Sequence, residues 1–182
     1  MNVRRTVRAL AATATLTAVV ALAPTAQAET VRVDDGADAM ASTTDIRTVR
    51  ITHGTHRLRV QVNFPNLKRK AQAVLAIYVD TNGSRRGPEY ALFTPLFSGG
   101  DYALLKMDGW NSGEPVECRY NAEFDWAGDQ VRFRAARGCF DKPDELRVGM
   151  RMRDEADPSH PVTDWLLGRR EFTRWLTSGD AA

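Results

Sequence analysis

The chain has 182 residues, of which 25 are Lys or Arg and 23 are Asp or Glu, and 43% are hydrophobic. Three of the basic residues and none of the acidic ones lie in residues 1–28, so residues 29–182 carry a formal net charge of −1. This balance argues against a nucleic-acid-binding role, which needs a basic surface. The size is usual for one domain with one hydrophobic core.

The first 28 residues have the three parts of a secretory signal peptide. A segment with three arginines precedes the uncharged run Ala9–Ala23, and the small-x-small sequence Ala26-Gln27-Ala28 follows. The run is short and rich in Ala and Thr, which argues against a membrane span, and no later apolar stretch is long enough for one. We expect cleavage after Ala28, export by the general secretory route, and a secreted, monomeric domain over residues 29–182.

Beyond the leader, alternation of apolar and polar residues indicates strands. The segment Arg57–Phe64 alternates as a half-buried antiparallel strand does. Ile46–Thr52 is its expected hairpin partner, and Gly54 in the turn can take a positive φ. The apolar, β-branched run Val74–Val79 predicts a central strand covered on both faces.

Later segments continue the strand pattern. Tyr90–Phe97 and Tyr102–Met107 form the next expected pair, and Pro95 predicts that the first of them is an edge strand or carries a bulge. Residues 146–152 alternate as well, and residues 165–176 are expected to add a last strand. Some eight or nine short strands predict an all-β fold, a two-sheet antiparallel β-sandwich of the immunoglobulin-like or jelly-roll-like type.

A hairpin over residues 116–137 has the most specific register, because its alternation pairs Phe124 with Val131. The same register brings Cys118 within reach of Cys139 if the return strand carries a slight bulge. An even number of cysteines in an exported chain favours a disulfide over free thiols. We therefore predict a bond between these two residues.

Three stretches within residues 30–137 have a recognisable pattern. They are Thr44-Asp45-Ile46 with Arg57–Val62, Ile77–Asn82 with Gly87–Tyr90, and Gly109-Trp110. They resemble the opening hairpin, a strand–loop–strand element and a following tryptophan of family 9 carbohydrate-binding modules and DOMON domains. With its Trp-rich end, the chain is also similar to a class of small, secreted actinobacterial proteins. The resemblance implies a β-sandwich and transfers no ligand.

Motifs for catalysis are absent. The sequence has no Gly-x-Ser-x-Gly, no His-Glu-x-x-His and no Gly-rich phosphate loop, so we expect a non-catalytic protein. His53 and His56 flank a turn, and without Cys or acidic partners they are expected to be exposed rather than to bind a metal. Cytochrome-like DOMON domains hold haem with Met and His side chains. Met150 and Met152 share one face of a strand with Leu146 and Val148, so we expect them in the core rather than at a haem.

Calcium is the one cofactor that the sequence suggests. Asp80, Asn82 and Glu89 are hard oxygen donors on one loop, which suits Ca²⁺ better than a transition metal. The same Asp-Thr-Asn-Gly sequence is also ordinary turn chemistry. Both interpretations stay open at this point.

Two further groups of side chains are candidates for binding. Aromatic residues at loop ends can stack on sugar rings or cap the core; they are Trp110, Trp126, Tyr90 and Tyr102, with Asp108 and Asn111 as hydrogen-bonding neighbours. Outward-facing arginines can form a basic stripe for acidic glycans or pair with acidic residues on the neighbouring strand; they are Arg132, Arg134, Arg147, Arg151 and Arg153.

The sequence therefore predicts a secreted, non-catalytic binding module, with extracellular or cell-envelope carbohydrate as the expected ligand. The alternative is a protein-interaction module, such as an inhibitor or the partner of a surface protein. An enzyme or a haem or metal redox domain is the third possibility.

Overall fold

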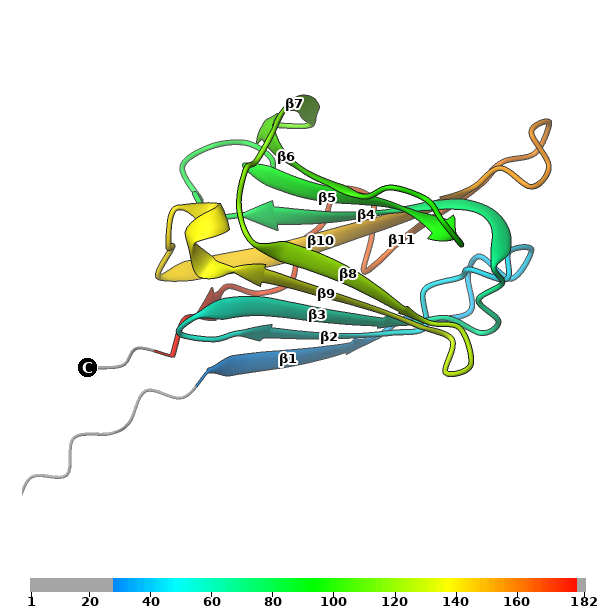
Figure 1. The fold of residues 1–182 in the computed structure, drawn as a ribbon, viewed down its shortest axis with the longest axis horizontal. Helices are drawn as coiled ribbons and strands as arrows, with labels where there is room; N and C mark the ends of the chain where they lie inside the picture. The colour runs from blue at the N-terminus through cyan, green and yellow to red at the C-terminus, as the bar shows by residue number, and fades with distance from the viewer. Residues whose placement is uncertain (1–27, 180–182) are drawn as a thin grey trace, which may run out of the picture.

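The structure is a computed structural model that describes residues 28–179. All but Ala28 of the expected signal peptide lies outside these residues. Twelve strands of the described chain form two antiparallel sheets that pack face to face, which confirms the predicted β-sandwich (Figure 1). Between residues 28 and 179, no helix is both long enough and apolar enough to cross a bilayer.

The first sheet has five strands. In spatial order they are β1 (Glu29–Asp34), β2 (Thr48–His53), β3 (Arg57–Asn63), β9 (Gln130–Ala136) and β8 (Tyr120–Asp125). The second sheet has seven strands, in the order β11 (Val162–Trp165), β10 (Glu145–Asp154), β4 (Lys70–Asp80), β5 (Tyr90–Phe97), β6 (Ala103–Asp108) and β7 (Asn111–Pro115), with β12 (Leu176–Thr177) also paired to β10.

The strand count exceeds the predicted eight or nine for identifiable reasons. All five residues of β7 are exposed, so this strand has no apolar alternation to reveal it. The expected last strand is two separate pieces, β11 and the two-residue β12. The strand β1 begins at Glu29, directly after the expected cleavage position, and its register with β2 runs from Glu29–His53 to Asp34–Thr48.

The predicted hairpins are present, and the pairing of Phe124 with Val131, the one register predicted from the sequence, is confirmed. Val49 pairs with Val62 between β2 and β3, and Phe124 pairs with Val131 between β8 and β9. Gly54 lies in the turn between β2 and β3 and does not adopt a positive φ there; its N–H donates to the Arg57 carbonyl oxygen at 3.0 Å. The inward side chains of both sheets form one core.

Pro95 predicted that its strand is either an edge strand or carries a bulge, and the structure shows an irregular strand that is not at an edge. The strand β5 lies between β4 and β6, so it is not an edge. Its pairing with β6 ends at Phe93, before the proline, and the register of β4 against β5 shifts between Lys70 and Val74. Pro95, which has no N–H, therefore occupies the end of β5 where no β6 partner needs one.

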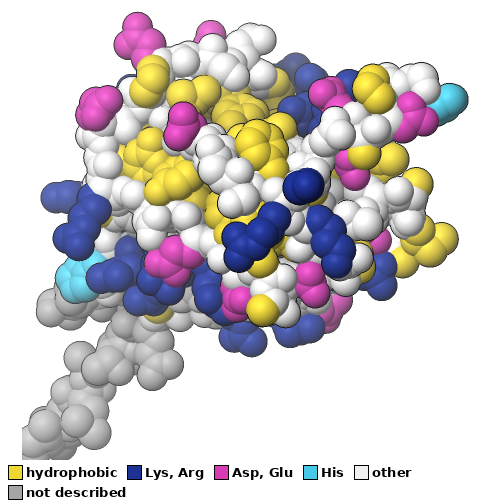
Figure 2. All heavy atoms as spheres, turned by 45° about the vertical axis from the view of Figure 1, so that its right-hand side comes forward, with side chains coloured by type: hydrophobic (Ala, Val, Ile, Leu, Met, Phe, Trp, Pro, Cys, Tyr) yellow, Lys and Arg dark blue, Asp and Glu magenta, His cyan; other side chains and the backbone are white. Residues whose placement is uncertain are grey.

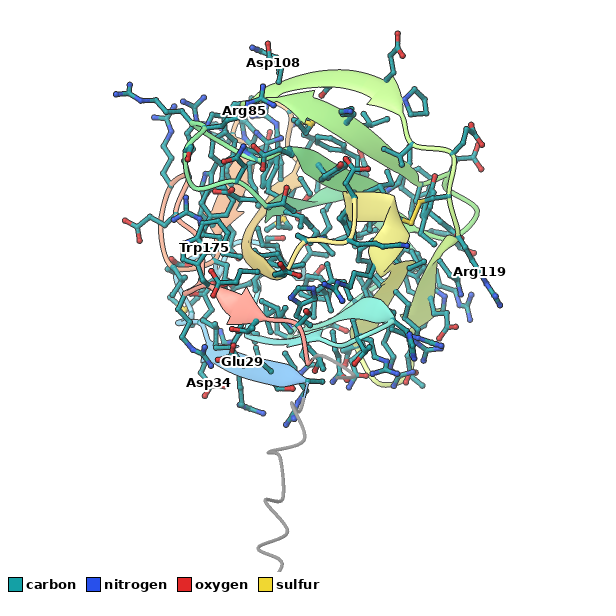
Figure 3. The ribbon with its side chains drawn as sticks, turned by 90° about the vertical axis from the view of Figure 1, so that its left-hand side faces the viewer. Glu29, Asp34, Arg85, Asp108, Arg119 and Trp175 are labelled. Atoms are coloured by element: carbon teal, nitrogen blue, oxygen red, sulfur yellow. A yellow bond between two sulfur atoms is a disulfide. The ribbon has the colours of Figure 1, made fainter. Side chains whose placement is uncertain are left out.

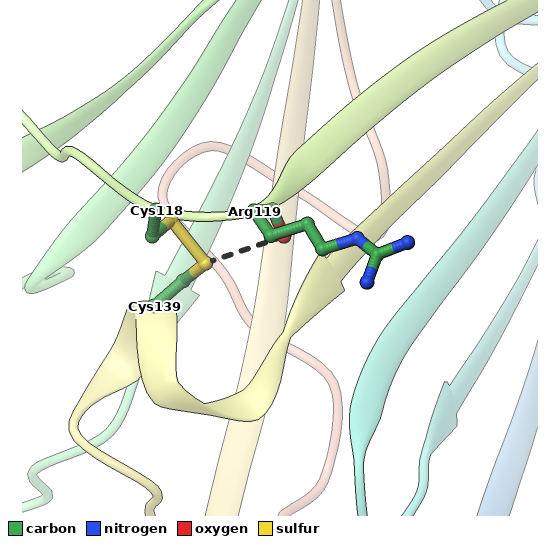
Figure 4. The surroundings of a disulfide bond; sticks show 3 residues. All are labelled: Cys118, Arg119 and Cys139. Atoms are coloured by element: carbon green, nitrogen blue, oxygen red, sulfur yellow. Dashed lines mark hydrogen bonds between the residues drawn. A yellow bond between two sulfur atoms is a disulfide. The ribbon is translucent and has the colours of Figure 1, made fainter.

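The predicted disulfide is present, with Cys118 and Cys139 joined at a Cα–Cα distance of 5.5 Å (Figure 4). A 3-10 helix at Arg137–Phe140, rather than a bulge, turns the chain so that the second cysteine meets the first. The Cys139 Sγ lies 3.6 Å from the Arg119 carbonyl oxygen. The bond thus joins the segment before β8 to the 3-10 helix that follows β9.

Candidate functional site

A second apolar cluster covers part of the outer face of the seven-stranded sheet. Its buried members are Ala76, Tyr78, Ala91 and Met107, and half-buried aromatic residues pack against them. The ring centroid of Trp110 lies 5.0 Å from that of Tyr78, 5.9 Å from that of Trp165 and 5.7 Å from that of Phe172. Trp110 is therefore an anchored, half-buried ring rather than a free platform.

Trp126 lies in a different place. Its ring stacks on Phe124 at a centroid distance of 5.0 Å and packs against the main core, with the Arg69 guanidinium 5.3 Å away. Figure 1 shows the β8–β9 turn at the lower right and β7, which follows Trp110, at the top. The structure therefore does not bring the two tryptophans together as the two sides of one sugar site.

The other predicted aromatic residues are separated as well. Tyr90 is buried, and its hydroxyl donates to Asp141 Oδ2 at 2.7 Å; burial and this carboxylate raise the pKa of the phenol. Tyr102 packs edge-on against Tyr120, and its hydroxyl donates to Asn121 Oδ1 at 3.0 Å. Tyr90 and Tyr102 therefore both pack within the fold.

A cleft beside Trp110 combines aromatic and basic side chains. It has a volume of about 490 Å³, and it is lined by Arg85, Arg86, Gly87, Trp110, Arg147, Arg170, Glu171 and Phe172. Four segments of the chain form it: the β4–β5 loop, the β6–β7 turn, the strand β10 and the chain between β11 and β12. The lining carries four arginines and one glutamate.

Glycine allows these segments to approach closely. Gly87 has a φ of +90°, and a Cβ at this position would lie 2.9 Å from the Gly109 Cα and 3.1 Å from the Trp110 indole nitrogen. Gly109 itself has a φ of +57°. A side chain at Gly87 would therefore push the β6–β7 turn away and change the wall of the cleft.

One cleft arginine, Arg147, is held by an ion pair and two aromatic rings. Arg147 donates from Nε at 2.8 Å to the buried Asp80 Oδ2, and its Nη2 lies 2.7 Å from the same oxygen. Its guanidinium carbon also lies 4.9 Å from the ring centroid of Phe172 and 4.7 Å from that of Trp175. This arginine therefore acts as part of the framework.

The other arginines of the cleft are more accessible. Arg85 forms an exposed ion pair with Asp108 at 3.2 Å, and Figure 3 shows the two residues side by side. Arg170 lies over the Trp110 ring at 5.1 Å. Within the described part of the chain, neither Arg86 nor Arg170 has an ion pair with a carboxylate. These two charges are available to a ligand.

The outward arginines do not form the single stripe that the sequence suggested. Arg132 and Arg134 belong to the five-stranded sheet, where they pair with Asp125 at 3.2 Å and Glu123 at 3.4 Å, as the cross-strand alternative predicted. Arg151 belongs to the other sheet, 5.7 Å from the Trp165 ring centroid. On the same strand, Arg153 pairs with Glu155.

The loop considered for calcium uses its oxygens internally. Asp80 Oδ1 accepts the Asn82 N–H at 3.0 Å, while its Oδ2 binds Arg147. Asn82 Oδ1 accepts the Ser84 N–H at 3.0 Å, and Glu89 Oε2 accepts the Thr81 N–H at 2.8 Å. Turn chemistry and one ion pair account for these three side chains, and calcium binding by this loop stays a prediction.

The histidine expectation was half wrong. His53 is fully buried rather than exposed, and its Nδ1 lies 2.9 Å from the Leu176 carbonyl oxygen. Burial lowers the pKa of this imidazole. His56 is exposed, as expected. Met150 and Met152 are both fully buried, which confirms their predicted place in the core.

Sequence reasoning missed the basic residues that line the cleft, Arg85, Arg86 and Arg170. A signal was present, because Arg85-Arg86 and Arg169-Arg170 are paired arginines beside glycine, each in a loop. Nothing in the sequence indicated that the two loops meet. A second hollow, of about 380 Å³ beside β8, includes Arg119, which Figure 3 shows far from Arg85.

Comparison of the sequence with models of protein families gives no match, and comparison with curated proteins gives none.

Proposed function

We propose that this protein is a secreted, non-catalytic module that binds an acidic polysaccharide in the cleft beside Trp110. The observation that carries the proposal is the pair Arg86 and Arg170, two arginines without a carboxylate partner in residues 28–179, next to an aromatic wall. Guanidinium groups bind carboxylate or phosphate through charge-assisted hydrogen bonds. The aromatic rings bury the apolar faces of sugar rings.

The shape of the cleft agrees with a polymer as the ligand. It is open and lined by loops, so a chain can lie across it without being enclosed. A glycosidase uses two carboxyl groups, whereas the cleft presents only Glu171 within the described chain, so the proposal includes no catalytic step. Burial raises the pKa of Tyr78, and the charges of Arg151 and Arg170 oppose this rise.

The experiment compares polygalacturonate with its methyl ester, which keeps the sugar backbone and removes the charge, and with a teichoic acid as the phosphate-bearing polymer. Affinity electrophoresis and calorimetry at two salt concentrations measure binding. Arg86→Gln and Arg170→Gln should each weaken binding roughly tenfold or more, because each removes a charge-assisted contact. Arg119→Gln, in the distant hollow, is the matched control and should bind as the wild type does.

The outcomes separate the possibilities. Binding to an acidic polymer that falls with salt and with both cleft variants supports the proposal. Equal binding to the methyl ester, or equal loss in Arg119→Gln, would contradict it. Trp126→Ala should lower stability and leave binding unchanged, because its ring lies outside the cleft.

A second candidate function, the protein-interaction module, rests on exposed apolar side chains. Val74 on β4 and Phe97 on β5 are each 41% exposed, and both belong to the outer face of the seven-stranded sheet. Figure 2 shows apolar side chains on the upper half of the face it presents, with Lys and Arg below them. If no polysaccharide binds, this candidate is tested by using the protein to capture secreted proteins. A partner that binds the wild type and not Val74→Asp supports it.

A further inference from the structure

Three carboxylates from separate parts of the chain converge away from the cleft. Asp35 and Asp38 lie in the loop that follows β1, at the right-hand end of Figure 1, and Asp164 lies in β11 of the other sheet. One carboxylate oxygen from each residue lies within 4.8 Å of the other two. Such close like charges repel unless a proton or a cation lies between them.

The neighbouring charges do not neutralise this cluster. Asp45, which is also buried, adds a fourth carboxylate nearby. Arg47 is the cation of this region, and its Nη1 already donates to Asp45 Oδ2 at 2.9 Å. Ion pairs of the described residues therefore leave Asp35, Asp38 and Asp164 without a bonded cation.

Two oxygens of the cluster are buried and have no hydrogen-bond donor. Asp164 is 2% exposed; its Oδ2 accepts the Ile46 N–H at 2.6 Å, and its Oδ1 has no partner. Asp35 Oδ2 is also buried without a partner. Only four side-chain atoms of residues 28–179 are in this condition, and two of them belong to this cluster. A buried carboxylate oxygen without a partner is costly, and a metal ion removes this cost.

We propose that Asp35, Asp38 and Asp164 bind a Ca²⁺ ion that joins the loop after β1 to the edge strand β11. All three donors are hard oxygens, and no His or Cys takes part, which selects Ca²⁺ or Mg²⁺ over transition metals. Ca²⁺ accepts six to eight oxygens in flexible geometry, whereas Mg²⁺ requires a near-octahedral shell. Asp38 is exposed, so solvent water can complete the shell of the larger ion.

The electrostatics of the metal-free site agree with this assignment. Burial raises the pKa of Asp164 to about 7, and the charges of Asp35, Asp38 and Asp45 add to the rise. Burial, with the charge of Asp38, also raises the pKa of Asp35. Burial thus disfavours the negative charge of Asp164 and Asp35. The site is distinct from the Asp80 loop, whose oxygens already have donors, and it does not depend on the function proposed for the cleft.

The test uses the chain treated with EDTA and then given CaCl₂ or MgCl₂, followed by thermal melting and calorimetry. At a Ca²⁺ concentration 100 times Kd, the ratio of folded to unfolded protein should rise about 100-fold, seen as a higher melting temperature. Asp38→Asn should weaken Ca²⁺ binding at least tenfold. In EDTA the same variant should melt at or above the wild-type temperature, because it relieves the repulsion.

Matched variants make the outcome decisive. Asp101→Asn, an exposed carboxylate with no ion pair in the described chain, should respond to Ca²⁺ as the wild type does. No Ca²⁺ response in the wild type, or an unchanged response in Asp38→Asn, overturns the proposal. Loss of the response in Asn82→Ala instead places the ion in the Asp80 loop and also overturns it. Asp38 is exposed, so its variant remains informative even if Asp164→Asn does not fold.

Discussion

Removal of the Arg147 side chain should destabilise the protein strongly, because it leaves a buried charge unpaired. Asp80 is fully buried, and both contacts of its Oδ2, at 2.8 and 2.7 Å, come from Arg147. Breaking a buried ion pair by removing one partner costs about 3–5 kcal/mol. Natural domains have a free energy of unfolding of roughly 5–15 kcal/mol, so Arg147→Ala should remove a large part of it.

The assay is urea denaturation followed by circular dichroism. Arg153→Ala on the same strand is the control, because its pair with Glu155 is exposed on both sides and should contribute about 1 kcal/mol or less. The double variant Asp80→Asn with Arg147→Met removes both charges and should be more stable than Arg147→Ala alone. A loss below about 1 kcal/mol in Arg147→Ala would refute the reasoning.

Three further predictions concern single features of the fold. The disulfide joins two cysteines that are 21 positions apart in the sequence, and replacing both by Ser should lower the free energy of unfolding by about 3 kcal/mol. Denaturation of the wild type and the variant measures this loss. Burial lowers the pKa of His53 in the folded protein, so the unfolded chain takes up a proton first and the contribution of His53 to stability should fall as the pH drops below about 6.5. Between about pH 7 and pH 5, His53→Gln, but not His56→Gln, should therefore become more stable relative to the wild type. Gly87→Ala should lower the melting temperature and weaken polysaccharide binding together, because the φ of +90° and the close approach of the β6–β7 turn both oppose a Cβ; an unchanged melting temperature would show that the turn yields freely.

Local pattern was sufficient to predict the hairpins. The pairing of Phe124 with Val131 followed from alternation and one turn, and the disulfide followed from the same register. Both depend on residues close in the sequence, where a shift by one residue would turn every apolar side chain outward. The strand β7 was not predicted, because all its residues are exposed and its sequence has no alternation of apolar and polar residues.

The candidate sites depend on contacts between distant segments, which the sequence does not encode locally. The cleft needs Arg86 and Trp110 to meet the chain near Arg170, and the acidic cluster needs Asp35 to meet Asp164 across two sheets. The local sequence also does not distinguish a buried, paired carboxylate from an exposed one that could bind a metal. The Asp80 loop has the composition of a calcium site, yet its carboxylate is matched by an arginine 67 positions later.

The most direct test of acidic polysaccharide binding is nuclear magnetic resonance of the four tryptophan indole groups in ¹⁵N-labelled protein, titrated with oligogalacturonate. The indole N–H of Trp110, which borders the cleft, should shift with ligand, while that of Trp126 should stay in place. The same titration with the methyl ester should move neither. Binding that leaves the Trp110 signal unchanged, or that shifts Trp126 instead, would contradict the placement of the ligand in this cleft.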